Sequence, residues 1–183
     1  MELWDLYDKD RQKTGKLHER GTPMPAGYYR LVVHVCVFNS RGELLIQHRH
    51  DEKNVWPGLW DLSAGGSSIA GDTSRSAASR ELYEELGIEH SFEEEAPALT
   101  VHFDYGFDDY YLLRADLDPA SLTLQKEEVQ GVRFATLDEV MALYRARKFI
   151  PYQEKLLELL FSIADVGYAH IREEDADDRR NPR

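Results

Sequence analysis

Alternating hydrophobic and polar positions predict strands in the first third of the chain. Residues 2–20 are expected to form a short hairpin around a polar turn at 8–12. Residues 30–38 are dense in valine, which is typical of a strand buried on both faces. An Asn-Ser-Arg-Gly turn at 39–42 leads to residues 43–49, which we expect to be the hairpin partner of that strand.

Helical signals begin at residue 73. Residues 73–86 are predicted to form a helix that ends at Gly87, because glycine readily adopts the left-handed conformation found at helix ends. Further strands are predicted at 59–64, 98–105, 109–117 and 129–135, and further helices at 137–148 and 151–166, with Pro151 in a first turn. This order indicates one mixed α/β domain over residues 1–170, followed by a charged tail at 171–183 that we expect to be disordered.

Composition narrows the class of protein. The 183 residues include 34 acidic and 22 basic side chains, which gives a formal net charge of −12. That charge disfavours a nucleic-acid polymer or an anionic membrane as partner. No apolar run approaches the ~20 residues that span a bilayer, and the N-terminus lacks the features of a signal peptide, so we expect a soluble cytoplasmic protein. The single cysteine, Cys36, is expected to be buried and inert.

Three glutamates share one face of the predicted helix at 73–86. At about 100° per residue, Glu81, Glu84 and Glu85 project into one sector, beside an apolar stripe that contains Leu82. Like charges at this spacing repel one another. Clustered carboxylate oxygens suit a hard divalent cation such as Mg²⁺, whereas a solvated acidic surface is the alternative. Spacing alone leaves both interpretations open.

The motif that contains these glutamates extends beyond the helix. It consists of Gly66, Asp72, Arg80, Glu81, Leu82, Glu84, Glu85, Gly87 and Ile88. This pattern resembles the Nudix box, and eight of the nine fixed positions match. The departure is Asp72, where the family has glutamate. We expect the shorter side chain either to reach a metal through water or to cap the helix that follows.

The resemblance implies a fold and a reaction. The fold would be a Nudix-type α/β/α sandwich with a mixed β-sheet, and the box would form a loop–helix–loop over residues 66–88. The reaction would be the hydrolysis of a nucleoside diphosphate linked to another group, by water attack on phosphorus with Mg²⁺ or Mn²⁺ as cofactor. The implied metal ligands are Glu81, Glu84, Glu85 and the backbone carbonyl of Gly65. Arg80 would orient the glutamates, and Glu81 is our choice of general base.

Cations outside the box are candidates for substrate binding. Arg49 and Lys53 follow the strand at 43–49, at a place where related Nudix proteins often carry cations that touch substrate phosphates. Phosphate oxygens accept charge-assisted hydrogen bonds from both residue types. Arg30 is a further candidate of the same kind. The alternative for each is an ordinary surface cation.

Three acidic residues and one histidine also have alternative interpretations. Asp108 and Asp109 are interpreted either as carboxylates near the site, as in the isomerase branch of the family, or as turn residues. Glu128 is either an additional catalytic glutamate or a solvated loop charge. His34, on an apolar strand, is expected to be a core histidine rather than a ligand.

Residues 44–60 resemble the Nudix branch related to isopentenyl-diphosphate isomerase. That isomerase keeps a catalytic cysteine where this chain has Gly65, and metal-binding histidines where it has Ser67 and Arg30. The joint absence of these groups favours hydrolysis over isomerisation. A non-catalytic nucleotide-binding Nudix domain is the other alternative. The expected partner is a small-molecule diphosphate, and the oligomeric state stays open, although homodimers are frequent in the family.

Overall fold

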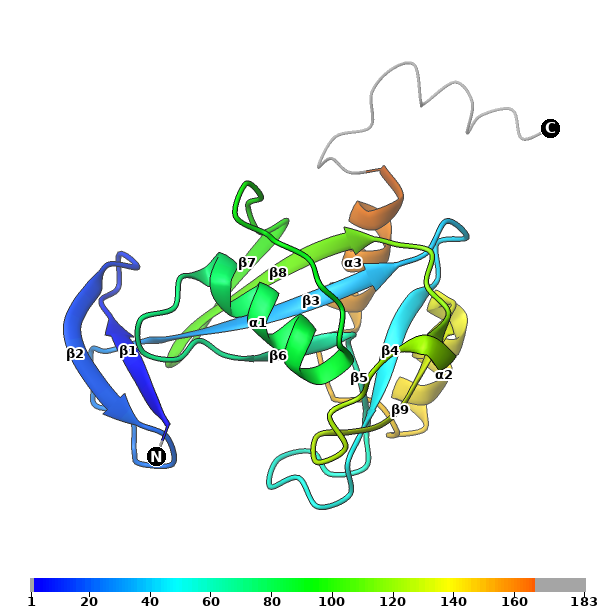
Figure 1. Ribbon diagram of the computed structural model, residues 1–183. Helices are drawn as coiled ribbons and strands as arrows, with labels where there is room; N and C mark the ends of the chain where they lie inside the picture. Colours follow the sequence, from blue (N-terminus) through cyan, green and yellow to red (C-terminus); the bar gives the residue numbers. More distant parts are fainter. Residues whose placement is uncertain (1, 167–183) are drawn as a thin grey trace.

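The computed structural model describes residues 2–166, and Figure 1 shows the course of the chain. The strands are β1 (Leu3–Tyr7), β2 (Lys13–Glu19), β3 (Arg30–Phe38), β4 (Leu44–Arg49), β5 (Trp60–Asp61), β6 (Ala64–Ser67), β7 (Leu99–Phe103), β8 (Gly106–Arg114) and β9 (Val129–Ala135). The helices are α1 (Ser74–Leu86), α2 (Leu137–Arg145), α3 (Glu154–Val166) and the short 3₁₀ helix η1 (Pro119–Ser121). The tail predicted at 171–183 lies outside the described residues. Within 2–166, no helix combines the length and apolar character needed to cross a bilayer.

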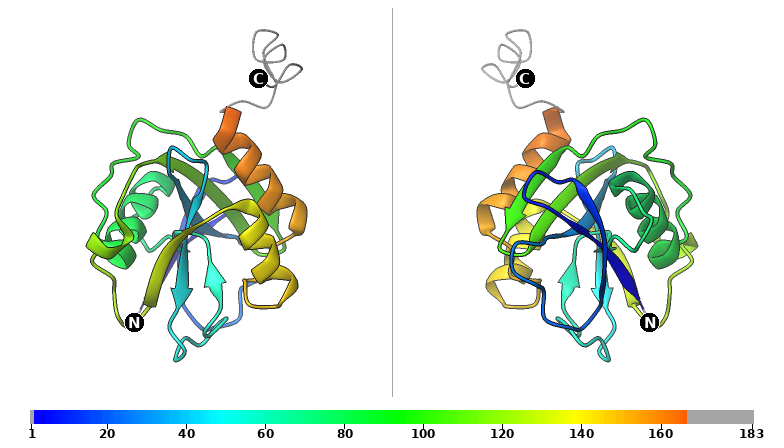
Figure 2. Two further views of the ribbon diagram at one scale, coloured as in Figure 1. Left: turned by 90° about the vertical axis from the view of Figure 1, so that its right-hand side faces the viewer. Right: turned by 90° about the vertical axis from the view of Figure 1, so that its left-hand side faces the viewer.

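Helices cover both faces of a mixed sheet, which confirms the predicted α/β/α sandwich. Figure 2 shows α1 on one side of the strands and α2 and α3 on the other. The apolar stripe of α1, with Leu82 and Leu86, packs in one buried cluster with Val33 of β3. On the other side, Phe38 lies in a second cluster with Leu157 of α3. The sheet is therefore the shared wall of two hydrophobic cores.

β3 is the strand on which the topology depends. It runs parallel to β8 along its whole length and antiparallel to β6. Its expected hairpin partner, β4, pairs with it only at Phe38 and Leu44, and otherwise pairs with β5 and β9. The hairpin prediction was therefore wrong beyond the turn, because β6 occupies the edge of β3 that β4 leaves.

The divergence of β3 and β4 leaves one face of β3 partly open. Val33 and Val35 are fully buried, whereas Arg30, Val32 and His34 alternate with them and are partly exposed. Successive side chains of a strand point to opposite faces. The expectation of burial on both faces holds only for the second half of the strand, where the two cores meet.

Two helices are shorter than the hydrophobic periodicity predicts. α2 ends at Arg145 rather than at residue 148, and α3 begins at Glu154 rather than at Pro151. The non-helical stretch between them carries Tyr152, whose hydroxyl donates a hydrogen bond to Asp61 of β5 at 2.7 Å. A long-range contact thus replaces the first turn that the proline signal predicts.

The predicted N-terminal hairpin forms β1 and β2, and a buried ion pair anchors it to the sheet. Asp109 lies inside β8, fully buried, and accepts hydrogen bonds from Arg11, Thr100 and Ser74, each at 2.6 Å. Arg11 projects from the hairpin turn with a left-handed φ of 60°. Among the described residues, Arg11 alone forms an ion pair with Asp109. The turn interpretation of Asp108 and Asp109 was wrong, because β8 begins at Gly106.

Removal of the Arg11 charge should destabilise the fold. The variant Arg11→Met keeps an aliphatic stem but leaves the buried Asp109 carboxylate without a cation, so we expect the free energy of unfolding to fall by about 3 kcal/mol. Urea denaturation followed by circular dichroism measures the change. Lys9→Met is the control, because Lys9 forms an exposed pair with Asp10 on the same hairpin and should contribute little. Equal effects of the two variants would contradict the anchoring role of Arg11.

Candidate active site

A cleft of about 580 Å³ opens beside the divergence of β3 and β4. Its walls carry every site residue that the sequence predicted except Asp109: Arg30 from β3, Arg49 from β4, Lys53 and Glu128 from loops, Gly65 from β6, and Arg80, Glu81, Glu84 and Glu85 from α1. Residues that lie far apart in the chain therefore meet in one cavity.

Two glycines allow β6 to lie close to its neighbours on both sides. A Cβ at Gly65 would lie 2.8 Å from the carbonyl oxygen of Val33 on β3. A Cβ at Gly66 would lie 2.4 Å from a carboxylate oxygen of Glu81 on α1. Both distances are shorter than real Cβ contacts, so a larger residue at Gly65 requires a backbone shift, and one at Gly66 would displace the Glu81 carboxylate. The glycines hold the Glu81 carboxylate directly against the backbone of β6.

Arg80 organises the acidic face of α1. Its Nη1 donates to Glu81 and to Glu84, both at 2.9 Å, and its Nη2 donates to Asp72 at 2.9 Å and to the carbonyl oxygen of Ser67 at 3.2 Å. The expectation that Asp72 caps the helix was wrong, because the capping hydroxyl belongs to Thr73. Asp72 does not line the cleft and instead forms an ion pair with the Arg80 guanidinium.

Glu85 is the most deeply buried of the three box glutamates. Only 3% of it is exposed, and its carboxylate accepts hydrogen bonds from Gln47 at 2.9 Å and from the backbone N–H of Gly65 at 3.0 Å. Burial, with a smaller contribution from the Glu81 charge, raises the pKa of Glu85 from 4.5 to about 8. Burial also raises the pKa of Glu81, although Arg80 acts against this. Sequence reasoning missed Gln47, whose signal was a polar side chain inside an apolar strand.

The carboxylates fit a hard divalent cation by their chemistry. Glu81, Glu84 and Glu85 offer oxygen ligands to one cleft, and no Lys or Arg of the described chain forms an ion pair with Glu85. A bound cation would offset that buried negative charge. Within residues 2–166, no three acidic, histidine or cysteine side chains already converge as a metal cluster, and Arg80 forms ion pairs with Glu81 and Glu84. Arg80 bonds to one carboxylate oxygen of Glu81 and one of Glu84, so a second oxygen of each residue is not engaged by Arg80.

The candidate cations differ in the contacts that their side chains already make within the protein. Arg30 donates to the Ser67 hydroxyl at 2.9 Å and lies over the rings of Trp4 and Phe103 at 4.9 and 5.6 Å from their centroids. Lys53 forms an ion pair with Glu128. Arg30 of β3 and Lys53 of the loop after β4 thus both line the cleft, and Glu128 pairs with Lys53.

The Arg49 guanidinium bonds to the loop that follows β4. Its guanidinium donates to the carbonyl oxygens of Val55 at 2.9 Å and Trp56 at 3.1 Å, and to the Asp61 carboxylate at 3.2 Å. All three nitrogens of the guanidinium therefore have partners within the protein. The structure places Arg49 at the cleft wall, where it ties the loop after β4 to β5.

Asp109 is not part of the cleft, contrary to our expectation. Its neighbour Asp108 lines the cleft instead, because adjacent strand residues point to opposite faces of the sheet. Asp108 lies 3.4 Å from Nε2 of His34, whose ring stacks on Tyr110 at a centroid distance of 4.6 Å. His34 also lines the cleft, so the expectation of a core histidine was wrong. The alternation of residues 30, 32 and 34 along β3 was the signal that could have placed it there.

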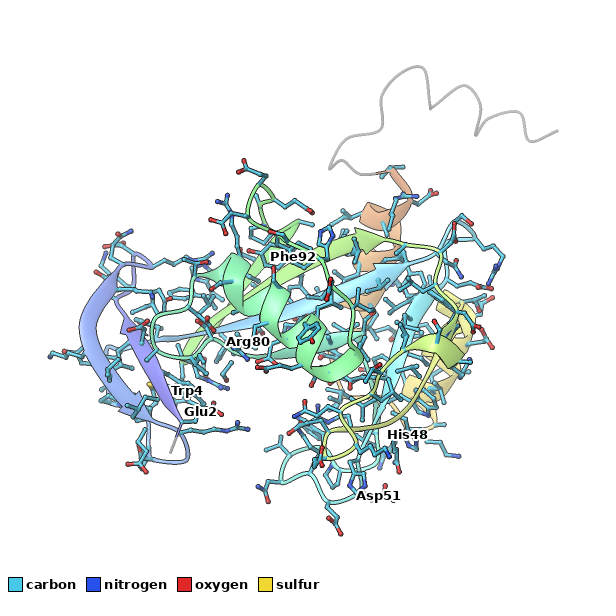
Figure 3. All side chains as sticks on the ribbon, in the orientation of Figure 1. Glu2, Trp4, His48, Asp51, Arg80 and Phe92 are labelled. Carbon is cyan, nitrogen blue, oxygen red and sulfur yellow. The ribbon has the colours of Figure 1, made fainter. Side chains whose placement is uncertain are left out.

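The N-terminal hairpin contributes to the cleft beyond the predicted set. Glu2 and Arg20 line the cavity, and Figure 3 shows Glu2 and Trp4 at the hairpin side of the site, near Arg80 of α1. The backbone N–H of Gly71 donates to the Asp5 carboxylate at 2.8 Å, which joins β1 to the loop before α1. The hairpin therefore braces the loop that leads into the acidic helix.

Comparison with known proteins agrees with this geometry. A family model described as NUDIX domain matches residues 28–160. The chain belongs to the Nudix family. A Nudix hydrolase of Listeria monocytogenes is 46% identical over 171 residues, which cover 93% of this chain and 100% of the relative. The protein is thus an enzyme of the Nudix hydrolase type, acting on phosphoanhydride bonds.

Matches at lower sequence identity include an isomerase and a solved structure. An isopentenyl-diphosphate Delta-isomerase of Streptomyces coelicolor is 31% identical over 145 residues, covering 75% of this chain and 73% of the isomerase. A crystal structure from Deinococcus radiodurans matches with a TM-score of 0.70 and 24% identity, over 87% of this chain and 99% of that one. The structural match supports the Nudix fold of this chain.

Glu85→Gln should stabilise the metal-free Nudix protein at alkaline pH. Because folding raises the pKa of Glu85 from 4.5 to about 8, the buried group lowers stability progressively as pH rises between these values. The neutral amide avoids this cost, so we expect a gain on the order of 1–3 kcal/mol near pH 8 that shrinks toward pH 5. Thermal unfolding in excess EDTA measures both. The half-exposed Glu84, changed to Gln, should show no such gain, and a pH-independent effect of Glu85→Gln would contradict the prediction.

Proposed function

We propose that the protein hydrolyses a diphosphate linkage in a small nucleoside diphosphate derivative, with Mg²⁺ or Mn²⁺ as cofactor. The observation that carries this proposal is the distribution of charge in the cleft. The α1 wall holds three carboxylates, whereas Arg30 and Lys53 present positive charge from other walls. A protein of net charge −12 needs cations to bind an anionic diphosphate. The carboxylates can bind a metal cation, and Arg30 and Lys53 are themselves cations.

The proposed metal ligands are Glu81, Glu84, Glu85 and the backbone carbonyl of Gly65. A divalent ion bound there would neutralise diphosphate charge and lower the pKa of an attacking water. Glu81 is our candidate for the general base, because its carboxylate is held against Gly66 inside the cleft. Arg80 positions Glu81 and Glu84 through hydrogen bonds of 2.9 Å.

Arg30 and Lys53 are proposed to bind the substrate phosphates. Arg30 is held by Trp4, Phe103 and Ser67, so its guanidinium loses little freedom when it binds an anion. Glu128 is proposed to position Lys53 rather than to take part in catalysis, since the two already form an ion pair. We assign the Arg49 guanidinium to loop structure, because its nitrogens already have protein partners.

Isomerase chemistry is a second candidate only because of the isomerase relatives. Protonation of an alkene would need an acid group in the cleft at the position that Gly65 occupies. Cys36, the single cysteine of the chain, is fully buried in the core between the sheet and α3, and burial raises its pKa far above the usual range. The structure thus offers the isomerase no thiol, which favours hydrolysis.

Glu81→Gln should reduce turnover by more than about 100-fold, because a ligand loss is expected to exceed the 10–100-fold effect of losing an outer-shell partner. The measurement is a mass-spectrometric assay with Mg²⁺ on nucleoside di- and triphosphates, nucleotide sugars, dinucleotides and isoprenoid diphosphates. Excess EDTA should abolish hydrolysis, and added Mg²⁺ or Mn²⁺ should restore it.

The control variant is Glu94→Gln, on an exposed loop away from the cleft, which should retain full activity. Metal-independent hydrolysis would contradict the cofactor assignment. Nucleotide-dependent thermal stabilisation without turnover would instead indicate a binding domain. Conversion of an isoprenoid diphosphate to its isomer would favour the isomerase.

A further inference from the structure

A second cavity of about 480 Å³ adjoins the cleft. It lies between the loop after β4 and the chain that joins α2 to α3, and its lining includes Trp56, Leu59, Tyr144 and Phe149. Trp56 lines both the cleft and this cavity. The size is typical of ligand pockets in proteins, which run from about 300 to 1,000 Å³. Nothing in the proposed hydrolysis uses this second cavity.

Trp56 is held at the junction of the two cavities at a cost. Trp56 is 46% exposed, and its backbone is left-handed, with φ at 53°. Large residues rarely adopt this conformation, and an exposed tryptophan gains little from burial. Arg49 donates to the carbonyl oxygens of Val55 and Trp56, so the loop is clamped in this form. A rigid, exposed indole beside a catalytic cleft is suited to stack on a planar ring.

Two arginines at the end of α2 complete the lining. Arg145 lies 3.6 Å from Glu154 and stays 70% exposed, and a cation is favourable at this helix C-terminus. Arg147 lies beyond the helix with a left-handed φ of 57°, and its guanidinium has no hydrogen-bond or ion-pair partner in the described part of the chain. In a protein of net charge −12, two arginines on one cavity form a local positive rim. That charge is complementary to an anionic group.

We propose that the second cavity binds the nucleoside arm of the substrate, with its base stacked on Trp56 and a phosphate monoester of its ribose bound by Arg145 and Arg147. This inference rests on the proposed function, because the diphosphate of the same molecule lies in the cleft. The substrate class is then a nucleoside diphosphate derivative that carries a further phosphate on the ribose. Guanidinium groups bind phosphate oxygens through paired, charge-assisted hydrogen bonds, and aromatic rings stack on any base.

Pairs of compounds that differ by one ribose phosphate test the arginines. Coenzyme A and dephospho-coenzyme A form one pair, and NADPH and NADH form another. We expect the wild-type protein to favour the phosphorylated member by about 10-fold or more in kcat/KM, as for one strong charge-assisted contact. Arg147→Gln should remove most of this preference and act through KM. Arg41→Gln, in the distant turn between β3 and β4, is the matched control and should preserve the preference.

Variants at Trp56 test the stacking surface separately. Trp56→Ala should raise KM for both members of a pair and leave their ratio unchanged, whereas Trp56→Phe should restore binding because it keeps a ring. Tyr105→Ala removes a comparably exposed aromatic residue that lines neither cavity, and it should leave KM unchanged. If the preference for the phosphorylated member of a pair were lost in Trp56→Ala but kept in Arg147→Gln, the assignment of the two contacts would be overturned.

A direct binding measurement separates this inference from the hydrolase proposal. Calorimetric titration compares adenosine 3′,5′-bisphosphate and adenosine 2′,5′-bisphosphate with AMP, on wild-type protein and on Arg147→Gln. Tighter binding of either bisphosphate, lost in the variant, supports the second site even if no compound is hydrolysed. Equal affinities for the bisphosphates and AMP overturn the inference, even where other diphosphates are hydrolysed in the Mg²⁺ assay. Absence of all hydrolysis, by contrast, contradicts the proposed function itself.

Discussion

The guanidinium of Arg80 holds together a wall of like charges. Glu81, Glu84 and Asp72 would repel one another at their spacing, and one cation bonds to all three and to the carbonyl oxygen of Ser67. Asp72, the residue that departs from the box, is long enough to bond to the Arg80 guanidinium. It does not line the cleft. The orientation of the acidic face of α1, and with it the cleft opposite, depends on this contact.

Two buried carboxylates show how differently the fold treats negative charge. Asp109 is matched by Arg11 and two hydroxyl donors, so its burial ties the N-terminal hairpin to the sheet. Glu85 accepts hydrogen bonds from the amide of Gln47 and a backbone N–H, and burial raises its pKa in spite of them. The first arrangement favours stability. The second leaves a buried carboxyl group at the cleft with no cationic partner among the described residues, which is a cost that functional sites commonly carry.

The divergence of β3 and β4 creates the space in which these charges meet. β4 turns away to pair with β5 and β9, so the open face of β3 and the loop after β4 become walls. Arg49 clamps that loop and thereby sets Trp56 between the cleft and the second cavity. One change in strand pairing therefore accounts for both the cleft and the second cavity beside it.

The sequence by itself determined the acidic helix, since helical periodicity and the stop at Gly87 are local properties of consecutive residues. Most of the other elements were also predictable from periodicity, and the box motif identified the α1 residues that line the cleft. Tertiary structure alone decided that Asp108 and not Asp109 faces the cleft, that His34 lines it, and that Arg49 serves its own loop. Strand pairing and side-chain partners join residues far apart in the chain, so a one-residue error in a strand's register or start reverses which face a side chain occupies.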